Sequence, residues 1–308
     1  MALVIDRNLW NKKAEIIEYF RKRGEECLQE VSAQFATNEY REKASEINQS
    51  IVEIKESLIS HILQKANVEK WENEIILKTV LSITYSSYVI MIDLRNNVWE
   101  YDYMAFSRRI GELWEPYCKL CFQFPLKKLE LFVPPLFVDV KRMMTAEIET
   151  YIDKLSINEN QKQELKSYYR KVWAMVTSGE IKLQLDLHFI QNGKMYNIDF
   201  KSGFGSNEKG NTNRLLLVAT IYKNLDPNYE CMLFVRADED TNNQYFITLK
   251  NSAVWTASCG NETYEKIHNF SGFDLKQWIR DNINWEDDLL PQTINHFRKN
   301  DLIKYLSW

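Results

Sequence analysis

The spacing of apolar residues is helical over about the first 120 positions of the chain. One apolar stripe recurs at steps of three and four residues and comprises Ile47, Ile51, Ile54, Leu58 and Ile62. Between Lys78 and Asp93, fourteen consecutive residues carry no charge, which is typical of a helix in the middle of a bundle. A dimer seam is the alternative, but fewer than three clear heptads favour packing within one bundle.

The prolines mark a change of pattern. Four of the six lie between residues 116 and 135, and proline disrupts helices and central strands. We therefore place a boundary near residues 125–140. The chain is expected to have three parts: a helical domain over residues 1–128, a mixed core over 129–260 and a C-terminal helical segment over 261–308.

Two helices are expected at the start of the core. The pattern favours a short helix over residues 145–155, and Ser156 with Glu159 resembles a capping box that begins a second helix ending near Val176. Ser178 and Gly179 are expected to stop this second helix.

From residue 181 the apolar period changes to two, which indicates strands. The alternation continues to residue 201, and a helix over 215–225 and a buried strand over 231–235 are expected to follow. The pattern predicts an α+β fold in which a mixed β-sheet is flanked by helices.

The segment 181–201 reads IKLQLDLHFIQNGKMYNIDFK and predicts a β-hairpin. Asn192 and Gly193 between alternating segments are the sequence signal of a two-residue type I′ turn, which requires positive φ at both positions. Such a turn fixes the register. It pairs apolar residues on one face, namely Leu187 with Ile198, Phe189 with Tyr196 and Leu185 with Phe200.

On the other face, the same register places Asp186 opposite Asp199, with Cα atoms about 4.5 Å apart. Like charges that face each other across a sheet are destabilising. A divalent cation removes this conflict, and Mg²⁺ is commonly bound by one or two carboxylates together with waters and phosphate oxygens. Lys201 lies two residues beyond Asp199 on the same face, where its ammonium group can reach a phosphate or an attacking water. The arrangement predicts metal-assisted phosphodiester hydrolysis by Asp186, Asp199 and Lys201.

An acid followed two residues later by lysine is a common string. It also occurs at positions 53–55, 139–141, 180–182 and 274–276. Only the copy at 199–201 follows a hairpin signal with an aspartate at the paired position. A solvated hairpin face and a metal or ligand site without hydrolytic activity are the alternatives.

Asp186, the hairpin turn and Asp199-Phe200-Lys201, with a helix before and a helix and strand after, resemble the PD-(D/E)xK nuclease superfamily, and most closely its restriction endonucleases. The resemblance covers roughly residues 140–240. It implies a restriction-endonuclease-like core, with Asp186 and Asp199 as Mg²⁺ ligands and Lys201 as the residue that orients or activates water. Leu185 replaces the proline of the motif, and Asp199 replaces the commoner glutamate.

Further residues are candidates around this motif. Members of the superfamily often add a carboxylate from the preceding helix, for which Glu147 and Glu149 are candidates, with a solvated helix surface as the alternative. Lys209 and Arg214 lie in the expected glycine-containing loop over residues 202–214 and are possible DNA contacts, although an ordinary surface loop is equally consistent with this composition. His188 shares the face of Asp186 and is a possible proton relay or DNA contact, although a surface histidine paired with Asn197 is favoured.

Composition narrows the function further. The 308 residues carry 39 basic and 43 acidic side chains, so no global positive field indicates a nucleic-acid partner, although residues 182–223 have a net charge of +3. Five cysteines are an odd count, which favours a reducing cytoplasm over a disulfide framework. We expect no membrane span, because the longest uninterrupted apolar stretch is eight residues and contains two prolines.

The sequence thus predicts a cytoplasmic Mg²⁺-dependent endonuclease that cleaves double-stranded DNA. A type II restriction enzyme acting as a homodimer is favoured, because no Walker motif is present. A repair, recombination or mobile-element nuclease of the same superfamily and a non-catalytic helical interaction protein are the alternatives.

Overall fold

The structure is a computed structural model that describes residues 3–176, 181–205 and 208–307. The elements of the N-terminal part are η1 (Leu9–Asn11), α1 (Lys13–Gln34), α2 (Tyr40–Glu69), α3 (Asn73–Val98) and α4 (Tyr103–Gln123). The middle of the chain contains β1 (Glu130–Leu131), α5 (Phe137–Asp153), α6 (Glu159–Val176), β2 (Leu187–Gln191), β3 (Lys194–Lys201), α7 (Lys209–Leu225), β4 (Tyr229–Val235), η2 (Glu239–Thr241), α8 (Gln244–Lys250) and β5 (Thr256–Cys259). The C-terminal part contains α9 (Gly260–Ser271), α10 (Leu275–Asn282), α11 (Trp285–Asp288), α12 (Pro291–Lys299) and η3 (Ile303–Leu306). These elements confirm the α+β class.

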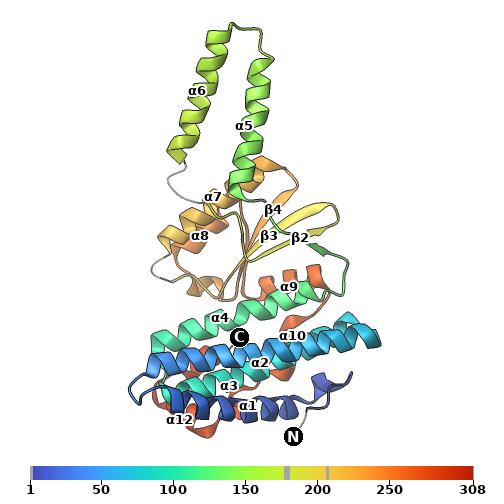
Figure 1. Cartoon of the computed structure of the whole chain (residues 1–308), viewed down its shortest axis with the longest axis vertical. Coiled ribbons are helices and arrows are strands. Elements are labelled where there is room, and N and C mark those ends of the chain that lie inside the picture. Colours follow the sequence, from blue (N-terminus) through green and yellow to red (C-terminus); the bar gives the residue numbers. More distant parts are fainter. Residues whose placement is uncertain (1–2, 177–180, 206–207, 308) are drawn as a thin grey trace.

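Helices α1 to α4 form a bundle with α3 at its centre (Figure 1). Every residue from Thr79 to Asn96 is buried, which explains the long uncharged run in the sequence. The hydroxyl groups of Thr79, Thr84, Ser86 and Ser87 donate hydrogen bonds to carbonyl oxygens within the helix, whereas Ser82 donates to the carbonyl oxygen of Trp10. The helical bundle predicted for this region is confirmed.

By length and composition alone, α3 could also cross a membrane. However, 83% of its most apolar window is buried inside the protein, as expected of the core helix of a bundle. The absence of a membrane span stays a prediction.

The five strands form one mixed sheet in the order β1-β2-β3-β4-β5. The pairs β1–β2 and β2–β3 are antiparallel, whereas β3–β4 and β4–β5 are parallel. The sheet lies between the helical bundle and helices α7 and α8 (Figure 1). Because both faces are covered, the central strand β3 is buried over residues 197–200.

Two hydrophobic clusters meet at the sheet. On the bundle side, Phe200 of β3 packs edge-on against Trp114 of α4, with ring centroids 5.9 Å apart. On the opposite side, Leu233 of β4 belongs to a cluster with Leu215 and Val218 of α7. Polar residues of β3 that face α7 are therefore enclosed rather than solvated.

Helices α5 and α6 form an antiparallel arm that extends away from the sheet (Figure 1). Helix α5 begins at Phe137, directly after the prolines, and is longer than the expected segment 145–155. Helix α6 begins at Glu159 as expected, but Asn158 and Gln161 form its capping box instead of Ser156 and Glu159. The expected stop at residues 178 and 179 lies outside the described residues.

The C-terminal segment packs against the bundle. The hydroxyl of Tyr85 on α3 donates a hydrogen bond of 2.6 Å to Asp288, and the backbone N–H of Leu290 donates one of 3.0 Å to Asp93. Side chains of residues 261–306, the bundle and one face of the sheet share a single hydrophobic cluster. The parts expected over residues 1–128 and 261–308 are therefore joined through one core.

Candidate active site

The hairpin forms in the predicted register. Asn192 and Gly193 both have positive φ, 53° and 78°, as a type I′ turn requires. The strands pair Gln191 with Lys194, Phe189 with Tyr196 and Leu187 with Ile198, which confirms these predictions.

The predicted extension of this pairing to Leu185 and Phe200 is wrong. Pairing between β2 and β3 ends at Leu187 and Ile198, and the chain bends at Asp186. Leu185 packs in the cluster beside α7, whereas Phe200 packs in the cluster of the bundle. The alternating pattern could not reveal this bend, because both faces of the sheet are covered by apolar clusters. An apolar residue such as Leu185 is therefore buried whichever face it lies on.

Asp186 lies close to Asp199, as expected, but the two residues are not paired across the hairpin. The Asp186 carboxylate accepts a hydrogen bond of 2.7 Å from the backbone N–H of Phe200, the residue that follows Asp199. Its negative charge is close enough to raise the pKa of Asp199. The two acids therefore lie close together, although Asp186 is in a bend and not in a ladder position.

Asp199 is the most enclosed group of the site, with a side chain only 2% exposed. Burial raises the pKa of its carboxyl group, Lys201 and Arg214 lower it, and Asp186 raises it further. The Lys201 ammonium forms an ion pair with Asp199 Oδ1, and Arg214 Nη2 lies 3.4 Å from Oδ2. Two cations thus balance a pair of neighbouring carboxylates.

Lys201 reaches the site from the end of β3. Besides its ion pair with Asp199, its ammonium group donates a hydrogen bond of 3.2 Å to the carbonyl oxygen of Phe200. The Lys201 side chain is 22% exposed, so it connects the buried carboxylate to the surface. Asp186 is also partly exposed, which leaves the site open to a substrate on this side.

The sequence placed Arg214 among possible DNA contacts, and the structure places it at the acids. Arg214 is on α7 and approaches both Asp199 and Asn211, whose side-chain oxygen accepts a hydrogen bond of 3.3 Å from it. No local signal could have shown this, because it depends on how α7 packs on the sheet. Lys209 is exposed in the first turn of the same helix.

His188 is not available for DNA contact. It is buried, with only 3% of its surface exposed, so the expectations of a surface histidine and of a DNA-contacting one are wrong. Its predicted pairing with Asn197 is confirmed, with 2.7 Å between Nδ1 and Oδ1. The alternating pattern suggested a solvent-exposed face for His188, but Tyr222 of α7 lies against it.

The two candidates for an additional acid are not brought to the site. Glu149 forms an ion pair of 2.6 Å with Arg170 of α6, and Glu147 is exposed on α5. Both lie on the arm that extends away from the sheet (Figure 1). Here the solvated helix surface is the interpretation that agrees with the structure.

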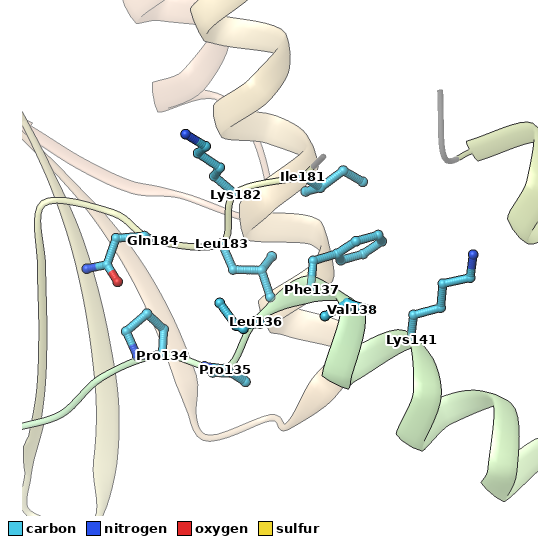
Figure 2. Close-up of a pocket in the computed structure, with 10 residues that line it drawn as sticks. All are labelled: Pro134, Pro135, Leu136, Phe137, Val138, Lys141, Ile181, Lys182, Leu183 and Gln184. Carbon is cyan, nitrogen blue, oxygen red and sulfur yellow. The ribbon is translucent and has the colours of Figure 1, made fainter. Parts of the chain in front are cut away.

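A pocket of about 460 Å³ lies beside the segment that leads to Asp186. It is formed by the start of α5 and by residues 181–184, and Figure 2 shows apolar side chains such as Phe137 and Leu183 together with Lys141 and Lys182. Its wall ends at Gln184, two residues before Asp186. The pocket itself combines apolar surface with positive charge, and its lining does not include Asp186, Asp199 or Lys201.

The acidic pair fits a magnesium ion. Asp199 Oδ1 is buried and, among the described contacts, accepts no aligned hydrogen bond, although the Lys201 ammonium lies against it. The described residues contain no group of three or more His, Cys, Asp or Glu side chains with metal-site geometry. Two carboxylates suit Mg²⁺, which keeps several waters and binds substrate phosphates, better than they suit a closed zinc site.

Comparison with protein-family models, with curated proteins and with solved structures gives no match to this chain.

Proposed function

We propose that this protein is a Mg²⁺-dependent endonuclease that hydrolyses phosphodiester bonds of double-stranded DNA. The observation that carries the proposal is the buried carboxylate of Asp199, which lies beside Asp186 and forms an ion pair with Lys201 at the end of a hairpin. The strand arrangement also supports it, because the hairpin is followed by a helix and a parallel strand, as the resemblance to PD-(D/E)xK nucleases implies.

Each residue has a role that follows from its position. Asp186 and Asp199 would hold Mg²⁺, which when bound supplies Lewis-acid stabilisation of the phosphate and lowers the pKa of a coordinated water. Lys201 presents an ammonium group at the surface end of the site, where it can stabilise charge that builds on the phosphoryl oxygens and orient the attacking water. Arg214 forms an ion pair with the second oxygen of Asp199 and so helps to hold this carboxylate in place.

The proposed enzyme is a type II restriction endonuclease that acts as a homodimer in the cytoplasm. A sequence-specific enzyme of this kind needs no helicase, and the chain contains no Walker motif.

Incubation of the purified protein with plasmid and phage DNA in the presence of Mg²⁺ tests the proposal. Discrete fragments are expected, whereas preferential cleavage of branched DNA would indicate a repair nuclease instead. Intact DNA under all conditions would contradict the nuclease assignment and favour a non-catalytic interaction protein.

Lys201→Ala provides the sharper test. Cleavage should fall at least about 100-fold, because the variant loses the lysine that forms an ion pair with Asp199. Lys276→Ala is the matched control, since Lys276 also follows an aspartate by two residues but lies on α10. Equal cleavage by the Lys201→Ala variant and the wild type would refute the assigned role.

A further inference from the structure

Strand pairing alone does not fix the position of Asp186. The ladder between β2 and β3 ends at Leu187 and Ile198, and Asp186 lies one residue beyond it, in a bend. The Gln184 side-chain amide donates a hydrogen bond of 3.0 Å to the carbonyl oxygen of Leu185, and two further hydrogen bonds connect the bend to the strands. One is the bond from the Phe200 N–H to Asp186, and the other is a bond of 2.9 Å from the Leu185 N–H to Nε2 of His188.

The Leu185 bond fixes the tautomer of His188. A backbone N–H can only donate, so Nε2 must accept and therefore carries no proton. Nδ1 then carries the proton of the neutral ring and donates to Asn197 Oδ1 at 2.7 Å. Burial lowers the pKa of His188, so the neutral ring that this arrangement needs is also the favoured one.

The histidine is itself held by a buried polar chain that crosses three strands. Asn197 is fully buried and pairs with His188 across the hairpin and with Cys231 across β3 and β4. Its side-chain nitrogen lies 3.9 Å from the Cys231 sulfur. The ring of Tyr222 on α7 lies over His188, with centroids 6.2 Å apart. The position of the imidazole is thus fixed from several sides.

We propose that His188 is a positioning residue, which holds the Leu185–Asp186 bend through its Nε2 acceptor and thereby keeps the Asp186 carboxylate beside Asp199. The metal-binding consequence of this inference rests on the proposed function, whereas its structural part concerns the bend alone. Loss of a group that holds a metal ligand in place without touching the metal commonly weakens metal affinity by about 10- to 100-fold.

Two substitutions separate the two hydrogen bonds of the ring. In His188→Gln, the side-chain amide is long enough to place an oxygen near the position of Nε2 and to accept from Leu185. In His188→Asn, the shorter amide can still donate to Asn197, but it does not reach Leu185. Both replace the ring by an amide, so loss of ring packing is common to the two variants.

The first readout is amide hydrogen exchange of the metal-free proteins, followed by NMR. The Leu185 and Phe200 amides should exchange at least about tenfold faster in the His188→Asn variant than in the His188→Gln variant, while amides of α3 exchange equally in both. Equal exchange at Leu185 and Phe200 in the two variants would overturn the inference.

The second readout is Mn²⁺ affinity measured by calorimetry. His188→Asn should weaken binding about tenfold, whereas His188→Gln should retain binding within about threefold of the wild type. Equal losses in both variants would show that ring packing matters and not the Nε2 acceptor, and would also overturn the inference. If the wild type itself bound no Mn²⁺, the proposed function would fail, and the exchange comparison would still decide the role of His188.

Discussion

At the residue scale, Asp199 illustrates how the site combines charges in an enclosed space. Burial disfavours the carboxylate, and the negative charge of Asp186 disfavours it further, while Lys201 and Arg214 favour it. Removing one charged side chain from such a cluster leaves the charges of the others without their partner. A bound cation between the two acids would relieve their repulsion, so metal binding and stability should be coupled.

The coupling predicts a metal-dependent stabilisation. Mg²⁺ at about 100 times its dissociation constant should raise the free energy of unfolding of the wild type by about 2.7 kcal/mol, because the ion binds only the folded protein. Asp199→Asn should abolish this increase, which denaturant titrations with Mg²⁺ or with chelator would measure. Lys276→Ala should respond like the wild type, and an unchanged Mg²⁺ response of Asp199→Asn would argue against the metal site.

At the scale of elements, the start of α12 is attached to α3 by one buried carboxylate. Asp93 of α3 accepts hydrogen bonds from Leu290, the residue before α12, and from Thr293 within it. Its side chain is only 2% exposed, and Arg21 lies 3.9 Å away. Burial raises the pKa of Asp93 to about 6, although the hydrogen bonds and Arg21 lower it in part.

A raised pKa makes this junction sensitive to pH. The folded state binds the proton of Asp93 more tightly than the unfolded state does, so protonation of Asp93 adds to the free energy of unfolding. This added stability is complete below about pH 4, and it is lost as the pH rises through 6. Asp93→Asn keeps an acceptor for Leu290 without the titration. The unfolding free energy of this variant relative to the wild type should therefore increase by about 2 kcal/mol between pH 4 and pH 7.

Chemical denaturation of both proteins across this pH range measures the difference. Asp240→Asn is the matched control, because Asp240 is exposed. A difference between Asp93→Asn and wild type that stays constant with pH would show that Asp93 does not titrate in this range.

At the scale of the whole molecule, the sheet lies between the bundle and α7, and the α5–α6 arm extends from the side opposite the bundle (Figure 1). The arm exposes large apolar side chains, among them Tyr151 and Tyr168, which are 66% and 55% exposed.

The proposed homodimer would have a mass of about 73 kDa, twice the 36.7 kDa of one chain. Sedimentation analysis measures this mass directly.

A dimer with one site per subunit should cut both strands in one binding event. Wild-type protein should then convert supercoiled plasmid to linear DNA without much nicked intermediate. After subunit exchange with an excess of the Lys201→Ala variant, nicked circles should accumulate, because mixed dimers cut a single strand. A mass of 36.7 kDa with an unchanged product pattern would contradict the dimer.

Local sequence determined the helical bundle of this protein and much of its hairpin. The stripe on α2 and the uncharged run on α3 were sufficient for the bundle, because helical burial follows a fixed period. Asn192 and Gly193 were sufficient for the register, because few residues adopt positive φ at both positions of a tight turn. These features depend on neighbours in the chain.

Only the tertiary structure decided how the candidate site is assembled. The bend at Asp186, the approach of Arg214 and the burial of His188 all depend on contacts between different elements, and Glu147 is kept from the site by the direction of the arm. The partners that a side chain finds on other elements are set by packing between those elements, and one sequence contains no local signal for that packing. The acids and the lysine could therefore be found by pattern, while the groups that hold them could not.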